Sequence, residues 1–176
     1  VNDQKNYHFQ IYEADVRTIM ERVARRVDDI GFVYVPEEQK RIFCEELEGN
    51  KLAFIELRRE PMQLYPGKKN ALAKQDGGTV TLEELKGQRL VQNYHEILEG
   101  APIWDGLEIS VLTNSDYITN RMLEETDLLN ISGGYLHPKE ACRYEMCVDG
   151  TAGSFLFGCI VYKGTELGRG IKELMS

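Results

Sequence analysis

The stretch at 60–74 reads EPMQLYPGKKNALAK, and the stretch at 80–92 reads VTLEELKGQRLVQ. Within the first, Met62–Tyr65 alternates in the manner of a short strand. Pro66 and Gly67 end that strand, because proline lacks the N–H that a sheet needs and glycine favours a turn. The polar residues that follow indicate a loop between the two stretches.

The second stretch predicts a short helix and then a strand. Thr81 and Glu84 fit a capping box, in which each side chain accepts a hydrogen bond from the backbone N–H of the other residue. Gly87 ends this helix, and Arg89–Gln92 is predicted to be a strand. Strands that alternate with helices in this way favour an α/β protein.

Toward the N-terminus, the sequence predicts a strand, a helix and a strand. Tyr7–Tyr12 alternates as a strand does, and apolar residues then recur every three or four positions over 16–30, with Asp15 as the N-cap. Phe32–Val35 is a continuous apolar run of the buried, parallel type. Together they predict a βαβ unit with a right-handed crossover.

The remaining elements are predicted from the same patterns. Phe43–Leu47 is expected as an extended piece on a sheet edge. Further strands are predicted at Leu52–Leu57, Leu107–Leu112, Leu128–Ile131, Cys142–Val148 and Phe155–Tyr162. Asn114 or Ser115 caps a helix over Asp116–Glu125, and Thr165–Met175 is predicted as a last helix, weakened by two glycines.

Composition excludes several classes of protein. The chain has 176 residues, 42% of them hydrophobic, and a net charge of −8, which suits one domain or two small lobes. Its basic residues are scattered, whereas a DNA-binding surface concentrates them, so this chain is not expected to bind nucleic acid or an anionic membrane by itself. No apolar run approaches the roughly 18 residues of a membrane span. With no secretory signal in Val1–Lys5, a cytoplasmic protein is expected.

Neither the cysteines nor any motif indicates catalysis. Cys44, Cys142, Cys147 and Cys159 lack zinc-site spacing, and reduced, buried thiols are expected, with a disulfide or redox switch as the alternative. The sequence contains no GxSxG, no P-loop, no HExxH and no GxGxxG after a strand. We therefore predict no catalytic residue, no cofactor and no metal, and we do not expect an enzyme.

The stretches at 60–74 and 80–92 resemble the effector-binding domain of LysR-type transcriptional regulators. The order of elements on both sides is similar to that family's as well, over nearly the whole chain. Two departures stand out. The family's DNA-reading helix-turn-helix, its linker helix and the first strand and helix of its effector domain have no counterpart here. In addition, Thr126 and Leu128 stand where the family often has glycines.

This resemblance implies an α/β fold of the type 2 periplasmic-binding-protein kind, with two Rossmann-like lobes joined by two crossover strands. Lobe I would comprise residues 1–65 and 153–176, and lobe II residues 66–152. A small-molecule effector would bind between the lobes, and DNA would be bound only through a separate N-terminal domain. The family's dimers imply a homodimer in which Val16–Val27 faces Asp116–Glu125 of the partner.

Ligands of such sheets bind beyond the carboxyl ends of the strands, where helix N-termini offer N–H groups. That rule and the resemblance select nine candidate effector-binding residues: Asn114, Ser115, Gln92, Asn93, Tyr94, Glu13, Tyr34, Val35 and Pro36. Structural roles remain open for several of them, since Ser115 also suits a cap, Asn93 a turn, Tyr34 a core position and Glu13 the field of a helix N-terminus. Two other functions remain open as well: an interaction module without a ligand, and a free-standing solute-binding protein.

Overall fold

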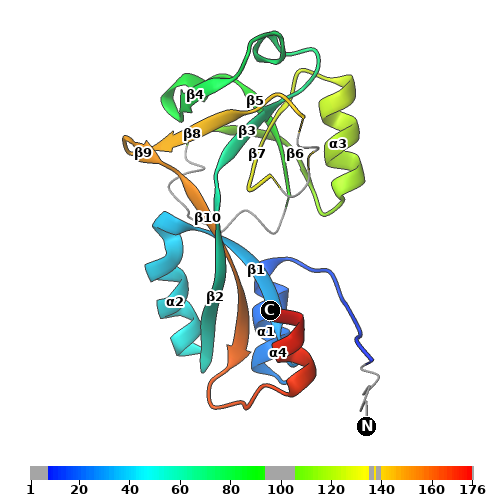
Figure 1. The fold of residues 1–176 in the computed structure, drawn as a ribbon, viewed down its shortest axis with the longest axis vertical. Coiled ribbons are helices and arrows are strands. Elements are labelled where there is room, and N and C mark those ends of the chain that lie inside the picture. Colours follow the sequence, from blue (N-terminus) through cyan, green and yellow to red (C-terminus); the bar gives the residue numbers. More distant parts are fainter. Residues whose placement is uncertain (1–7, 94–105, 135–136, 138–139, 176) are drawn as a thin grey trace.

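A computed structural model of the chain describes residues 8–93, 106–134, 137 and 140–175. These residues form two β-sheets that lie one above the other in Figure 1. The smaller sheet has the strand order β1 (Gly31–Pro36), β10 (Ser154–Tyr162) and β2 (Leu52–Pro61), and its neighbouring strands are antiparallel. We call this sheet with its helices lobe I, and the larger sheet with its helices lobe II.

The larger sheet has the order β4–β8–β3–β7–β5–β6, with β9 paired to β8. Its strands are β3 (Gln63–Pro66), β4 (Gly78–Thr81), β5 (Arg89–Asn93), β6 (Glu108–Thr113), β7 (Leu129–Ser132), β8 (Tyr144–Val148) and β9 (Thr151–Ala152). Strand β5 runs parallel to both β6 and β7. The expected α/β architecture is confirmed.

The chain crosses between the sheets at two adjacent points. Met62 links β2 to β3, and Gly153 links β9 to β10. The N–H of Met62 donates to the carbonyl of Gly153 at 2.9 Å. A Cβ on Gly153 would lie 3.2 Å from Met62 Sδ and 3.0 Å from a methyl group of Val148, so the small residue permits the close approach. The lobe boundaries expected at 65/66 and 152/153 remain a prediction.

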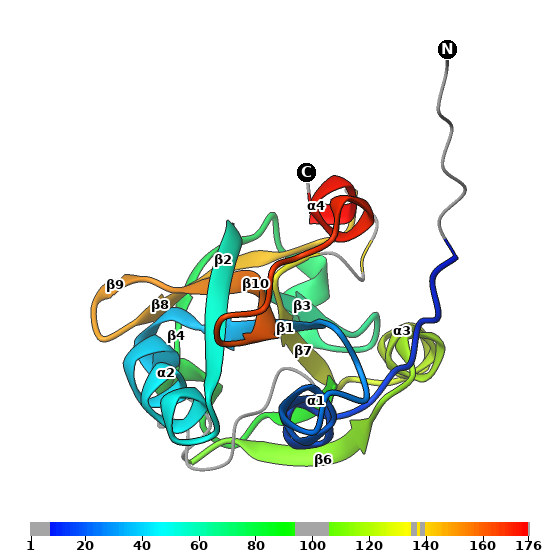
Figure 2. The same cartoon turned by 90° about the horizontal axis from the view of Figure 1, so that it is seen from below.

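In lobe I, two helices cover the same face of the small sheet (Figure 2). These are α1 (Val16–Ala24) and α2 (Lys40–Gly49). Their shared core consists of Val16, Met20, Val23, Val33, Val35, Phe43, Leu47, Leu52 and Ile160. Helix α4 (Arg169–Met175) ends the described chain. Helices α1 and α4 are both shorter than the sequence patterns predicted.

In lobe II, both faces of the sheet are covered. One face carries the larger core, with Leu64, Leu90 and Ile131 among its members, and it is closed by the loop that contains the 3₁₀ helices η2 (Ala71–Lys74) and η3 (Glu83–Leu85). The other face packs under α3 (Asp116–Glu125) through Tyr65, Val91, Leu123 and Leu128.

The predicted capping box is present before η3. The backbone N–H of Thr81 donates to Glu84 Oε2 at 2.7 Å, and the N–H of Glu84 donates to Thr81 Oγ1 at 3.4 Å. The predicted bounds of α3 are also confirmed, and Ser115 is its N-cap.

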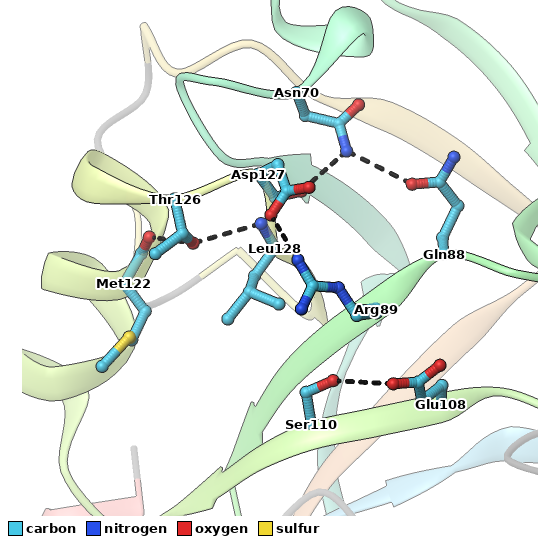
Figure 3. Close-up of polar contacts among 9 residues, drawn as sticks. All are labelled: Asn70, Gln88, Arg89, Glu108, Ser110, Met122, Thr126, Asp127 and Leu128. Atoms are coloured by element: carbon cyan, nitrogen blue, oxygen red, sulfur yellow. Dashed lines mark hydrogen bonds and ion pairs between the residues drawn. The ribbon is translucent and has the colours of Figure 1, made fainter.

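A network of side chains holds the turn between α3 and β7 (Figure 3). Thr126 Oγ1 donates to the carbonyl of Met122 at 2.6 Å and accepts from the N–H of Leu128 at 3.1 Å. Asn70 donates to the carbonyl of Asp127 at 2.7 Å, and Arg89 forms an ion pair with the Asp127 carboxylate at 3.0 Å. Thr126, the departure seen in the sequence, therefore ends α3 and fixes the turn that leads to β7.

Residues 43–47 lie in helix α2, so the expected extended piece was wrong. Phe43 and Leu47 are four positions apart, and both are buried in the lobe I core. Most of the residues between and around them are charged. A spacing of four between buried residues is typical of a helix. Two buried positions within five residues are, however, too few to distinguish a helix from a strand by sequence pattern.

Residues 8–12 do not form a strand, so the predicted βαβ unit was also wrong. Phe9, Ile11 and Tyr12 are exposed, and Tyr7 lies outside the described residues. Among the strands that the structure describes, β1 pairs with β10 and does so antiparallel, contrary to the parallel type expected. An alternating sequence becomes a strand only where a partner accepts its backbone hydrogen bonds.

Within the described residues, no helix is long and apolar enough to cross a membrane, and no group of His, Cys, Asp or Glu is arranged to hold a metal. The four cysteines are free thiols. Only Cys159 is buried, whereas Cys44, Cys142 and Cys147 are half-buried, so the expectation of buried thiols holds for one position.

Candidate functional site

The carboxyl ends of three parallel strands in lobe II meet at one edge of the sheet. Strands β5, β6 and β7 end there at Asn93, Thr113 and Ser132. Strand β3 runs antiparallel to β7 and begins at the same edge, because Gln63 pairs with Ser132. Since Gln63 directly follows the crossing residue Met62, this edge lies next to the strands that join the lobes. We call this region the junction.

Gln92 lies near this edge, but its carboxamide is used inside the protein. The side chain is fully buried. Its Nε2 donates to the carbonyl of Ile131 at 2.9 Å, and its Oε1 accepts from the N–H of Ile131 at 2.7 Å. Strands β5 and β7 pair only at Leu90 and Leu129. The Gln92 side chain therefore replaces backbone pairing where the two strands separate.

Asn93 connects the end of β5 to the first turns of α3. It is fully buried, its Nδ2 donates to Asp116 Oδ1 at 2.9 Å, and its Oδ1 accepts from Thr119 Oγ1 at 2.6 Å. Both polar atoms of the side chain are thus engaged within lobe II. Tyr94, the next predicted residue, lies outside the described residues.

Ser115 and Asn114 follow β6 at the same edge. Ser115 Oγ accepts from the N–H of Ile118 at 3.4 Å, which is the N-cap bond of α3. Asn114 is exposed. Of the four described lobe II candidates, Asn114 therefore has the most accessible side chain.

The lobe I candidates divide into core and surface positions. Val35 and Pro36 are buried at the end of β1. Tyr34 is half-buried, with its ring 4.8 Å from that of Phe157. Glu13 is exposed in the segment before α1, which does not form the strand that the prediction required. Tyr34 lies at the junction, because its side chain packs against the core of lobe II. Val35 belongs to the lobe I core.

A polar cluster that the sequence analysis did not select lies at the junction. Arg58 Nη2 donates to the hydroxyl of Tyr34 at 3.0 Å, and Arg58 Nε pairs with Glu60 Oε1 at 2.7 Å. The guanidinium also lies 4.6 Å from the ring centre of Phe157. We call Tyr34, Arg58 and Glu60 the junction cluster.

The junction cluster lies against the edge of lobe II. A Cβ on Gly133, the residue after β7, would be 2.7 Å from Glu60 Oε2. The Glu60 side chain is 18% exposed and that of Arg58 is 55% exposed, so the carboxylate faces lobe II while the guanidinium remains accessible. The sequence signal was the run RREP at 58–61 directly before the crossing, which the strand predicted at Leu52–Leu57 left out.

A second set of contacts joins β2 and β10 to Glu37, which directly follows β1. Ser154 Oγ, at the start of β10, donates to Glu37 Oε2, and Arg59 Nη2 pairs with Glu37 Oε1 at 2.8 Å. Partial desolvation raises the pKa of Glu38, although this residue is exposed at the surface, and the carboxylates of Glu37 and Asp149 add to the shift. The carboxylates of Glu37, Glu38 and Asp149 therefore lie close to one another, with Arg59 as the ion-pair partner of Glu37.

Comparisons with known proteins were made on sequence and on structure. No protein-family model and no curated protein matches the sequence. Among solved structures, the oxidised form of OxyR superposes with a TM-score of 0.65 at 13% identity, over 92% of this chain and 76% of that chain. The effector binding domain of QuiR, in complex with shikimate, gives 0.58 at 10% identity, over 90% and 74%.

The fold is that of LysR-type effector-binding domains. A putative phosphate ABC transporter substrate-binding protein from Clostridium perfringens, with bound phosphate, matches as well, with a TM-score of 0.58 at 13% identity over 92% of this chain and 76% of that chain. The type 2 periplasmic-binding-protein fold that the resemblance implied is thereby confirmed. In the LysR-type effector-domain fold of this chain, the junction is the region between the two lobes.

Proposed function

We propose that this chain is the small-molecule sensing domain of a LysR-type transcriptional regulator, and that its effector binds at the junction. The observation that carries the proposal is the position of the junction cluster. The half-exposed guanidinium of Arg58 stands on one crossing strand and is paired with Glu60, whose carboxylate lies beside Gly133 at the end of β7. The fold is one shared with effector-binding domains. A binding role, without catalysis, follows from the same assignment.

Arg58 is the group through which the effector would be held. Its Nε and Nη2 are engaged by Glu60 and Tyr34, which fix the plane of the guanidinium. A fixed guanidinium presents its remaining N–H donors in a set direction. We infer an effector that offers a hydrogen-bond acceptor there, such as a carboxylate, a phosphate or a carbonyl oxygen.

The predicted division into lobe I (1–65 and 153–176) and lobe II (66–152) describes the parts that would move. Met62 and Gly153 lie side by side where the chain crosses, so rotation there would change few backbone angles. An effector shifts the balance between two lobe arrangements only as far as its affinities for them differ. In the proposed parent protein, a separate domain would bind DNA, since this chain has a net charge of −8.

The predicted homodimer would use α3 more than α1. The apolar residues Val16, Met20 and Val23 of α1 are buried in their own lobe. Helix α3 instead exposes Tyr117 and Ile118. We propose that any dimer of the expected head-to-tail kind buries this face of α3 against polar and half-buried residues of α1.

An interaction module of the same fold is the second candidate. It is favoured by Gln92 and Asn93, whose polar side-chain atoms are engaged inside lobe II. Such a module would carry the effector-domain fold without an effector, and it differs from a sensor in its response to small molecules.

A thermal-shift screen of carboxylates, phosphates and neutral metabolites separates the two functions, because a ligand that binds only the folded state raises the Tm. We expect a compound that stabilises the wild-type protein and the Arg41→Ala variant, but not Arg58→Ala. Arg41 is the matched control, since it forms an exposed ion pair on α2. Stabilisation that persists in Arg58→Ala would contradict the assignment of Arg58, and a screen without any stabilising compound would favour the interaction module.

A further inference from the structure

Lobe II contains a cavity that is separate from the junction. It has a volume of about 650 Å³ and lies on the α3 side of the sheet. Tyr65 and Pro66 of β3, Leu123 of α3 and Ala73 of η2 contribute to its walls, together with His137. Ligand pockets commonly have volumes of about 300–1,000 Å³, so a small molecule fits. None of the eight described effector candidates and none of the junction cluster lines this cavity.

The walls are mainly apolar and well supported. Tyr65 and Leu123 belong to the core beneath α3. The ring of His137 stacks on that of Tyr65, with centroids 3.8 Å apart. The N–H of Lys68 donates to the carbonyl of Leu123 at 2.7 Å, which joins two parts of the wall. The cavity is thus bounded by packed elements of lobe II.

His137 brings a polar atom to this apolar wall. Asn130 Nδ2 donates to the carbonyl of Val91 at 2.9 Å and to Gln92 Oε1 at 3.2 Å. The amide oxygen of Asn130 must therefore be the atom that faces His137 Nε2, at 2.9 Å. An amide oxygen only accepts, so Nε2 carries the proton.

The other ring nitrogen of His137 is then a hydrogen-bond acceptor. Burial lowers the pKa of His137 to about 4, so the ring is neutral at physiological pH and Nδ1 keeps its lone pair. Among the described residues, no group donates to Nδ1. His137 is half-buried and lines a mainly apolar wall, so a ligand N–H or O–H can donate a hydrogen bond to Nδ1 there.

The charged residues of the lining set the charge of the ligand. Lys68, Glu124 and Glu140 all contribute to the cavity and all are exposed. Glu124 is paired with Arg121 at 3.2 Å, which leaves the opposite charges of Lys68 and Glu140. This balance favours a ligand without net charge.

We propose that this cavity is a second small-molecule site, which takes a compact, uncharged and largely apolar molecule whose N–H or O–H group donates to His137 Nδ1. This proposal does not depend on the proposed effector site, since no residue of the junction cluster lines the cavity.

Indole and 1-methylindole provide a matched pair of probes, since they share the ring system but only indole has an N–H donor. Binding is measured by titration, with NMR chemical shifts of the protein to locate it. We expect saturable binding of indole, with 1-methylindole about three- to tenfold weaker, which is the effect of one hydrogen bond. In His137→Phe, which keeps a ring on Tyr65, the two probes should bind equally.

Ala73→Trp is designed to fill the cavity and abolish binding, while Ala71→Trp on the exposed part of the same 3₁₀ helix should leave it unchanged. Ala141→Trp fills the cavity from another wall should Ala73→Trp unfold the protein. Arg58→Ala should bind indole normally, which separates this site from the junction. Indole that fails to saturate, or that still binds when the cavity is filled, overturns the site, and equal binding of both probes to the wild type overturns the role of His137.

Discussion

Gln92 and Ile131 are joined by two hydrogen bonds between one side chain and one residue's backbone, with lengths of 2.9 and 2.7 Å. The carboxamide of Gln92 takes the place of a backbone peptide between β5 and β7. Without it, the N–H and the carbonyl of Ile131 would be buried and without partners. This contact holds together the edge of lobe II at which the effector is proposed to bind.

Gln92→Leu should lower the free energy of unfolding by about 2–4 kcal/mol, because two buried backbone groups lose their partners. Urea denaturation monitored by circular dichroism measures the change. Gln75→Leu, at an exposed position, serves as the control and should stay within about 0.5 kcal/mol of the wild type. Equal stability of the two variants would show that the Gln92 bonds do not matter.

Gly67→Ala and Gly49→Ala should have opposite effects. A Cβ on Gly67 would lie 2.5 Å from the carbonyl oxygen of Thr126 and 2.7 Å from that of Leu128. Both are backbone atoms, so the α3–β7 turn must shift, at a cost of about 2–3 kcal/mol. At Gly49 in α2 no atom lies within 4 Å, and alanine should stabilise the helix by up to about 1 kcal/mol.

The same unfolding experiment compares these two glycine variants directly. Loss of stability on changing Gly49, or none on changing Gly67, would contradict the packing of the turn between α3 and β7.

The burial of His137 makes stability depend on pH. Its pKa is lowered from 6.5 to about 4 in the folded protein. Between these values the unfolded chain binds a proton that the folded protein does not, so stability is complete above about pH 6.5 and falls as the pH is lowered toward about 4. The whole shift corresponds to about 3 kcal/mol.

Unfolding free energies of the wild type and of His137→Phe, measured at several pH values, should show a shallower pH dependence in the variant. NMR titration of the ring protons gives the pKa directly. A pKa near 6.5 would contradict the buried position that both the cavity and the stack on Tyr65 require.

Asp15 caps α1, as the sequence predicted. Its carboxylate accepts from the N–H of Thr18 at 2.9 Å and from the Thr18 hydroxyl at 2.8 Å, and these bonds lower its pKa. Asp15→Ala should destabilise the protein by about 1 kcal/mol, whereas Asp15→Asn retains most of the cap. Asp29→Ala, at an exposed site, is the control. The thermal midpoints of the variants are expected to fall in the order Asp29→Ala, Asp15→Asn and Asp15→Ala, from most to least stable.

Local patterns were sufficient for much of the fold. The cap and bounds of α3, the capping box at Thr81 and the apolar strand at 155–162 all appear as predicted, because each depends on residues that are neighbours in the chain. Over residues 8–12 the predicted strand does not form, because alternation in the sequence does not by itself supply backbone pairing in a sheet. The prediction for 43–47 failed because five residues are too few to distinguish a helical from an alternating pattern.

The candidate site was less predictable than the fold. The rule that ligands bind beyond the carboxyl ends of strands led to Gln92, Asn93 and Ser115. It could not say which of their polar atoms already form hydrogen bonds within the protein. The Gln92–Ile131 contact spans 39 residues and the Asn93–Thr119 contact spans 26. Arg58 was not selected, since its role depends on Tyr34, which is 24 residues away.

The sequence by itself determined the class of fold, most of its strands, and the caps of α1 and α3 with the capping box at Thr81. These follow from hydrophobic periodicity and from backbone preferences that act over a few residues. Only the tertiary structure decided which polar side chains are consumed inside lobe II, which guanidinium stands at the junction and where a cavity remains beside His137. Each of these results from hydrogen bonding and packing between segments that the folded chain alone brings together.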